Sequence, residues 1–143
     1  MTRTEAEWGE WARRHRACFQ GVPLVEVVKG ERLQVGFSLT LYVAAPLETA
    51  PGAREAAVAA LWEELKRLAD DVAPPEQRTA RVQLEQAARV VLRPENGFEP
   101  EVGLTFHLFP RGGGLTAVTE PDRERVAQVE KRLVAFGVKQ GRA

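Results

Sequence analysis

The stretch that decides the fold is residues 32–43, which read Arg-Leu-Gln-Val-Gly-Phe-Ser-Leu-Thr-Leu-Tyr-Val. Apolar side chains occupy every second position of it, namely Leu33, Val35, Phe37, Leu39, Leu41 and Val43. Successive side chains of a β-strand point to opposite faces, so this pattern predicts a long strand with one buried face. The other face is polar and carries the chain's only serine and only tyrosine, Ser38 and Tyr42. Such a strand is typical of a mainly antiparallel sheet.

Two hairpins are predicted around this pattern. A β-branched run over residues 22–28 precedes the long strand, and the short turn Lys29-Gly30-Glu31 joins the two. Farther along the chain, alternating apolar residues predict a strand over 101–109. The turn sequence Pro94-Glu95-Asn96-Gly97 pairs it with a strand over 88–93.

Residues 80–93 leave two interpretations open, because alternating and helical spacings of apolar side chains both fit them. The run Val90-Val91-Leu92 favours a strand for at least 88–93. Residues 115–118 are compatible with a further short edge strand.

Three amphipathic helices are predicted. The first covers residues 5–19, starts with a capping box at Thr4 and Glu7, and ends at Gly21. The second covers residues 50–73 and joins the two hairpins.

The third helix follows the capping box Thr119-Glu120-Pro121-Asp122 and ends at Gly137. Its apolar stripe consists of Val126, Val129, Leu133 and Phe136. The complete prediction is a single α+β domain over residues 1–143. It has a sheet of four or five mainly antiparallel strands, three helices, the order α-ββ-α-ββ(β)-α, and a frayed tail over 137–143.

Composition narrows the class of protein. The 143 residues hold 20 basic and 20 acidic side chains, whereas a nucleic-acid-binding protein usually carries a basic excess. One cysteine excludes an internal disulfide framework, and neither a signal peptide nor a membrane-spanning segment is apparent. We therefore expect a cytoplasmic protein. The absence of isoleucine and the excess of arginine over lysine are typical of a GC-rich bacterial genome, and a thermophilic source would fit as well.

Catalytic motifs are weak throughout. Ser38 lacks the second glycine and the sharp turn of a nucleophile elbow. His15, Cys18 and His107 do not have the spacing of a zinc site, so no metal, cofactor or catalytic residue is predicted. Arg111 and the three glycines after it could hold an anion, although a plain connection fits them better. Asp70-Asp71, at the end of the second helix, is predicted to be solvated.

The leading hypothesis is a non-enzymatic protein–protein interaction module, such as an adaptor, regulator or immunity-type protein. Its partner surface would be the polar and aromatic face of the sheet, with Tyr42, His107, Phe109 and Arg111. Trp8 and Trp11 either fill the core or extend this partner surface as exposed aromatic anchors. A protein partner is expected, or a homodimer formed through this face or an edge strand. The alternative is a small-molecule binding domain or minor enzyme with a pocket near His107 and Arg111.

Overall fold

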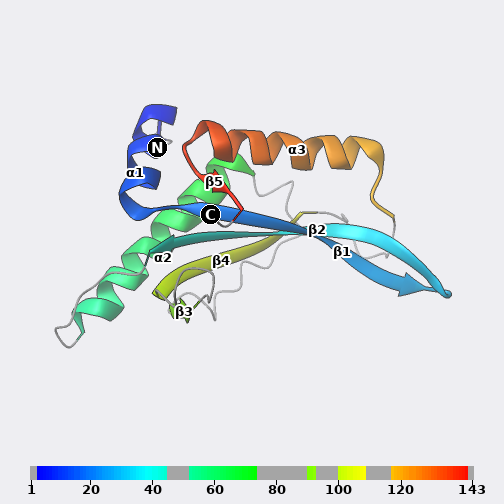
Figure 1. The fold of residues 1–143 in the computed structure, drawn as a ribbon, viewed down its shortest axis with the longest axis horizontal. Coiled ribbons are helices and arrows are strands. Elements are labelled where there is room, and N and C mark those ends of the chain that lie inside the picture. Colours follow the sequence, from blue (N-terminus) through cyan, green and yellow to red (C-terminus); the bar gives the residue numbers. More distant parts are fainter. Residues whose placement is uncertain (1–2, 45–51, 74–89, 93–99, 109–116, 142–143) are drawn as a thin grey trace.

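The computed structural model describes residues 3–44, 52–73, 90–92, 100–108 and 117–141 (Figure 1). The elements follow the order α1 (Glu5–His15), β1 (Cys18–Val28), β2 (Glu31–Ala44), α2 (Ala53–Val72), β3 (Val90–Leu92), β4 (Pro100–Leu108), α3 (Glu120–Ala135) and β5 (Lys139–Gln140). The predicted α+β class and the order α-ββ-α-ββ-α are therefore confirmed.

One five-stranded sheet, in the order β3-β4-β2-β1-β5, organises the molecule. The neighbours β1 and β2, β2 and β4, and β3 and β4 are antiparallel, whereas β5 runs parallel to β1. Both predicted hairpins are present. The strand at the ambiguous segment covers Val90–Leu92, while residues 80–89 and the Asn96-Gly97 turn lie outside the described residues.

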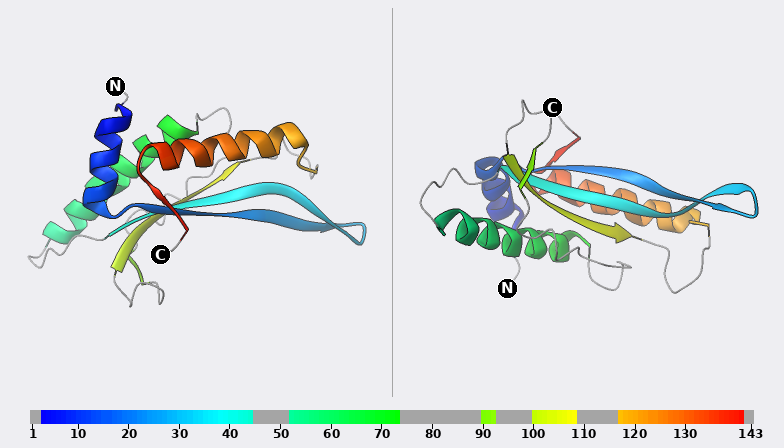
Figure 2. Two further views of the ribbon diagram at one scale, coloured as in Figure 1. Left: turned by 45° about the horizontal axis from the view of Figure 1, so that its top comes forward. Right: turned by 90° about the horizontal axis from the view of Figure 1, so that it is seen from below.

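The three helices pack on one face of the sheet (Figure 2). That face presents the apolar row of β2 beside matching rows of β1 and β4, because Phe19 pairs with Leu41 and Leu41 with Leu104. The helices add Trp8 and Trp11 from α1, a leucine stripe from α2, and Val126, Val129 and Leu133 from α3 to the same cluster. The fold is thus two layers with one core between them.

Two capping boxes begin helices as predicted. The backbone N–H of Glu7 donates to the Thr4 hydroxyl at 3.2 Å, and the Thr4 N–H donates to the Glu7 carboxylate at 3.3 Å. At α3 the Thr119 N–H donates to the Asp122 carboxylate at 3.1 Å. Both boxes satisfy backbone donors that the first helical turn leaves unpaired.

The first helix is shorter than the sequence predicts. It ends at His15, because Arg16 adopts a left-handed conformation with φ of 55°, and the chain enters β1 at Cys18. Phe19, which fits the helical stripe, is fully buried on β1. Tertiary packing of this ring therefore outweighs the local helical pattern.

The fifth strand lies at the C-terminal end of the described chain. Of the predicted edge strand over 115–118, the described residues 117–118 are not strand, although the Val118 N–H donates to the Gln34 carbonyl at 2.7 Å. The predicted frayed tail instead contains β5. Gly137, at φ of 86°, reverses the chain, and Val138 is buried, so Lys139 and Gln140 align with β1.

A β-bulge interrupts the alternation of β2. Leu24 pairs with Gly36 but Val25 pairs with Gln34, so Val35 is the extra residue. Between the bulge and Val43, odd-numbered residues of β2 pair with odd-numbered residues of β1, whereas on the turn side of the bulge they pair with even-numbered ones. Leu33 therefore lies opposite Glu26 and does not continue the row of Phe37. The prediction of six apolar side chains on one face thus holds only from the bulge to Val43.

Candidate functional site

The predicted polar face exists, and the strand register brings two of its predicted residues onto it. Tyr42 lies opposite Gly103 and Ser38 lies opposite His107, so Tyr42 and His107 share the face that the helices do not cover. Phe109 and Arg111, the other two residues predicted there, lie outside the described residues.

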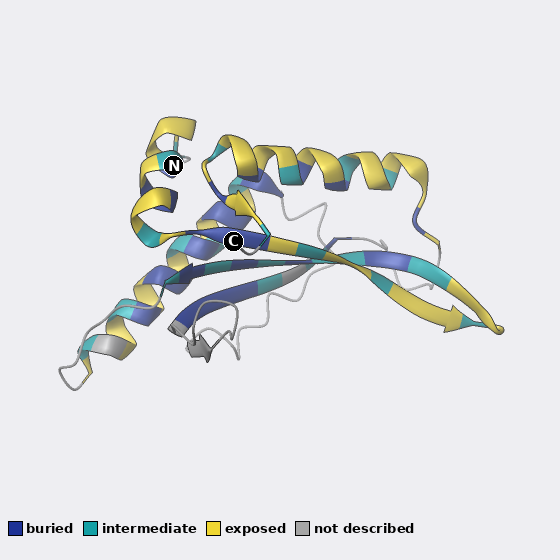
Figure 3. Ribbon diagram, in the orientation of Figure 1, coloured by how far each residue is buried: buried dark blue, intermediate teal, exposed yellow. Residues whose placement is uncertain are grey.

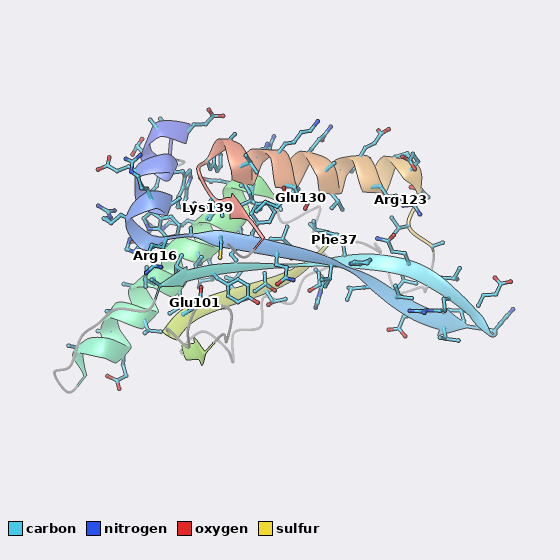
Figure 4. All side chains as sticks on the ribbon, in the orientation of Figure 1. Arg16, Phe37, Glu101, Arg123, Glu130 and Lys139 are labelled. Carbon is cyan, nitrogen blue, oxygen red and sulfur yellow. The ribbon has the colours of Figure 1, made fainter. Side chains whose placement is uncertain are left out.

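Side chains on this face are mostly half-buried and pack among themselves. The hydroxyls of Thr40 and Thr105 share a hydrogen bond of 2.9 Å. The Tyr42 ring covers Gly103, where an added Cβ would lie 3.3 Å from ring carbons Cδ1 and Cε1. At the end of the face next to β3, Glu101 is 5% exposed (Figure 4). This interlocked surface offers a partner few mobile side chains.

Ser38 and His107 are the nearest approach to a nucleophile and base. They oppose each other across β2 and β4, yet no hydrogen bond connects these two described side chains. The His107 Nδ1 atom is buried and has no hydrogen-bond partner among the described residues. A serine nucleophile needs a base within hydrogen-bond reach, so this pair lacks the geometry of a hydrolytic site.

Trp8 and Trp11 lie in the core, where they are 0% and 2% exposed. The Trp8 indole N–H donates to Asp71 at 2.6 Å, and the Trp11 indole N–H donates to Glu64. Both tryptophans therefore fill the core, the other interpretation that the sequence allowed. The prediction that Asp71 is merely solvated is wrong, because α1 packs against the carboxylate.

Sequence reasoning missed this tryptophan–carboxylate pairing between α1 and α2. A buried indole N–H requires an acceptor, but a carbonyl, a hydroxyl or a carboxylate can serve, so this requirement does not by itself point to an acid. Glu64 and Asp71 are seven residues apart and so share one side of α2, while Trp8 and Trp11 share one side of α1. The spacing alone could not distinguish these acids from the other carboxylates of the chain.

A hollow of about 390 Å³ lies between α1, α2 and the end of β2. Its walls are Arg14, His15, Ala44, Ala57, Ala60, Leu61 and Glu64. Burial lowers the pKa of His15 below its ordinary value, and the nearby Glu64 carboxylate partly opposes that shift. The hollow therefore places the His15 imidazole beside an alanine-rich wall, and its lining residues differ from those of the pocket predicted near His107 and Arg111.

Among the described residues, most of the large hydrophobic side chains that are exposed lie on the β1–β2 hairpin. We call its projecting part, residues 22–34, the arm. Its tip extends past the N-terminal end of α3, and Phe37 lies near the place where the arm begins (Figures 1 and 4). The β1 side of the arm is largely exposed (Figure 3). Val22, Val25 and Val27 are 46%, 42% and 66% exposed.

Comparisons with known proteins give no guide to function. No protein-family model, no curated protein and no solved structure matches this chain. Within the described ranges, no helix is long and apolar enough to cross a membrane, and no three potential metal ligands gather.

Proposed function

We propose that this protein is a non-enzymatic protein–protein interaction module whose contact surface is the arm. Among the described residues, four large hydrophobic side chains are exposed, and three of them, Val22, Val25 and Val27, lie on the arm. This concentration is the observation that carries the proposal. Scattered exposed apolar residues are normal on a monomer, whereas this concentration on one projecting strand, with Val25 and Val27 on one face of β1 and Val22 on the other, supports a contact surface.

The isolation of the arm supports the same conclusion. A two-stranded hairpin is marginally stable in water, and three or more strands or a packed helix are needed to hold it. The main body supports the arm at its base, where the Val118 N–H donates to the Gln34 carbonyl. A partner that covers the valines would supply the missing packing.

Site-specific photo-crosslinking in the protein's own host tests this proposal. A benzoyl-phenylalanine at position 27 should give a discrete crosslinked product, because the Val27 side chain would face the partner. The control places the same group at Ala127, an exposed position on α3. If position 27 yields no product beyond that of position 127, the arm is not a contact surface.

The hollow between α1 and α2 supports a second candidate function, the binding of a small apolar molecule. Its alanines provide an apolar wall, and Arg14 and Glu64 add one charge of each sign. Anilinonaphthalene sulfonate, which combines apolar rings with an anion, should brighten on binding the folded protein. Ala57→Leu should reduce that signal by filling the hollow, and an undiminished signal in this variant would exclude the site.

A further inference from the structure

Among the described residues, only the short β5 pairs with the outer edge of β1. The carbonyls of Ala17 and Phe19 accept hydrogen bonds from the backbone N–H groups of Lys139 and Gly141, at 3.1 and 2.7 Å. Odd-numbered residues of β1 therefore direct their backbone groups outward. β5 pairs only with Cys18 and Phe19, and no other described strand continues that edge. Past the two residues that pair with β5, the backbone groups of β1 that point outward belong to Gly21, Pro23, Val25 and Val27.

We propose that this edge pairs with the same edge of a second copy of the chain, antiparallel across a two-fold axis. The inference rests on the proposed function of the arm and names its partner. An exposed strand edge is a ready template for another strand. A two-fold contact uses the same patch on both copies, so one patch must complement itself.

The charges of the arm do not prevent such a contact. Glu26 and Glu31 are balanced by Lys29 and Arg32, so the patch carries both signs equally. A patch of one sign would repel its own copy, whereas a balanced patch can meet itself. An acidic or basic partner would find no such match, and this favours a second copy over another charged protein.

The residues of β1 also select a register. A pair centred on Pro23 would place two prolines together and lose both hydrogen bonds there, since proline has no N–H. A pair centred on Glu26 would oppose two carboxylates, which is destabilising. Centring on Val25 sets Val25 against the partner's Val25 and Val27 against the partner's Pro23. The exposed valines on this face then gain apolar neighbours.

The extent of the arm predicts the strength of the dimer. The arm contains thirteen residues, whereas a standard stable interface uses about 20–30 residues a side. Pro23 also removes one hydrogen bond from each end of the pairing. We therefore expect a weak dimer that dissociates on dilution through the micromolar range.

Cysteine crosslinking tests the register with a matched pair of variants. Val25→Cys should form an intermolecular disulfide under mild oxidation, because opposed residues of antiparallel strands lie within disulfide reach, about 4.4–6.8 Å between Cα atoms. Val22 is exposed to a similar degree but would oppose the partner's Val28. Val22→Cys should therefore crosslink roughly tenfold more slowly. Equal rates for the two variants would overturn the register.

Sedimentation velocity measures the association itself. Val27→Thr should weaken the dimer about tenfold, since each dimer contains the change twice. The control is Val134→Thr, at an exposed valine of α3 outside the arm, and it should leave the dimer unchanged. A wild-type chain that stays monomeric at several hundred micromolar would refute the second copy as partner. The photo-crosslink at position 27 would then show whether the arm binds a different protein or none.

Discussion

Gly21 is the position where one added methyl group tests the packing at the base of the arm. The Phe37 ring lies across this glycine, and an added Cβ would lie only 2.5 Å from ring carbon Cε1. Real Cβ atoms do not approach so closely, so Gly21→Ala must displace the ring. Phe37 packs against the core, and its displacement therefore disturbs the junction of arm and body.

The magnitude follows from two opposing effects. Overpacking of this kind typically costs about 1–3 kcal/mol, while replacing glycine within a strand returns roughly 0.5–1 kcal/mol. We expect a net loss of about 1–2 kcal/mol in the free energy of unfolding. For a chain of this length that loss lowers Tm by roughly 3–6 °C.

Urea denaturation followed by tryptophan fluorescence measures this loss. Gly103→Ala is the matched control, because its Cβ would meet the Tyr42 ring at 3.3 Å, a distance that a shift of a few tenths of an ångström relieves. This control should change stability by less than about 0.5 kcal/mol. Adding Phe37→Leu to Gly21→Ala should recover part of the loss. The reasoning fails if Gly21→Ala is as stable as the wild type, or if the double variant shows no coupling.

Three further outcomes are expected. Trp8→Phe removes a buried indole donor from Asp71 and should cost about 2 kcal/mol in chemical denaturation, whereas Asp71→Asn keeps an acceptor and should cost less. The lowered pKa of His15 contributes stability that is present above its ordinary pKa and is lost as pH falls through the folded value. His15→Gln should therefore flatten the stability profile between about pH 7 and pH 5. Burial raises the pKa of Glu130. The stability that this carboxyl contributes is therefore present below its ordinary pKa and is lost as pH rises through its pKa in the folded state. Glu130→Gln should consequently stabilise the protein at about pH 7 relative to about pH 4, and thermal melts at both pH values check this.

Two residues of the predicted partner surface follow directly from the alternation of their strands. Tyr42 and His107 share a face because their positions in two alternating strands determine which way they point. The spacing of Trp8 and Trp11 was compatible with both a core and a partner surface. Helical spacing shows which side chains share one side of a helix, but not whether another element packs against that side. Their carboxylate partners lie on another helix, more than fifty residues away along the chain, where no local pattern connects them.

The sequence by itself determined the elements whose cause is local. Alternation along residues 37–43 specifies one buried face, and the capping boxes at Thr4 and Thr119 specify two helix starts, because these interactions involve residues that are neighbours along the chain. Only the tertiary structure decided that Phe19 leaves the helix, that β5 joins the sheet, and that β2 bulges at Val35. It also decided that the hairpin extends beyond the helices and leaves the arm uncovered. Such features depend on which distant surfaces meet, and a pattern of period two or 3.6 carries no information about that.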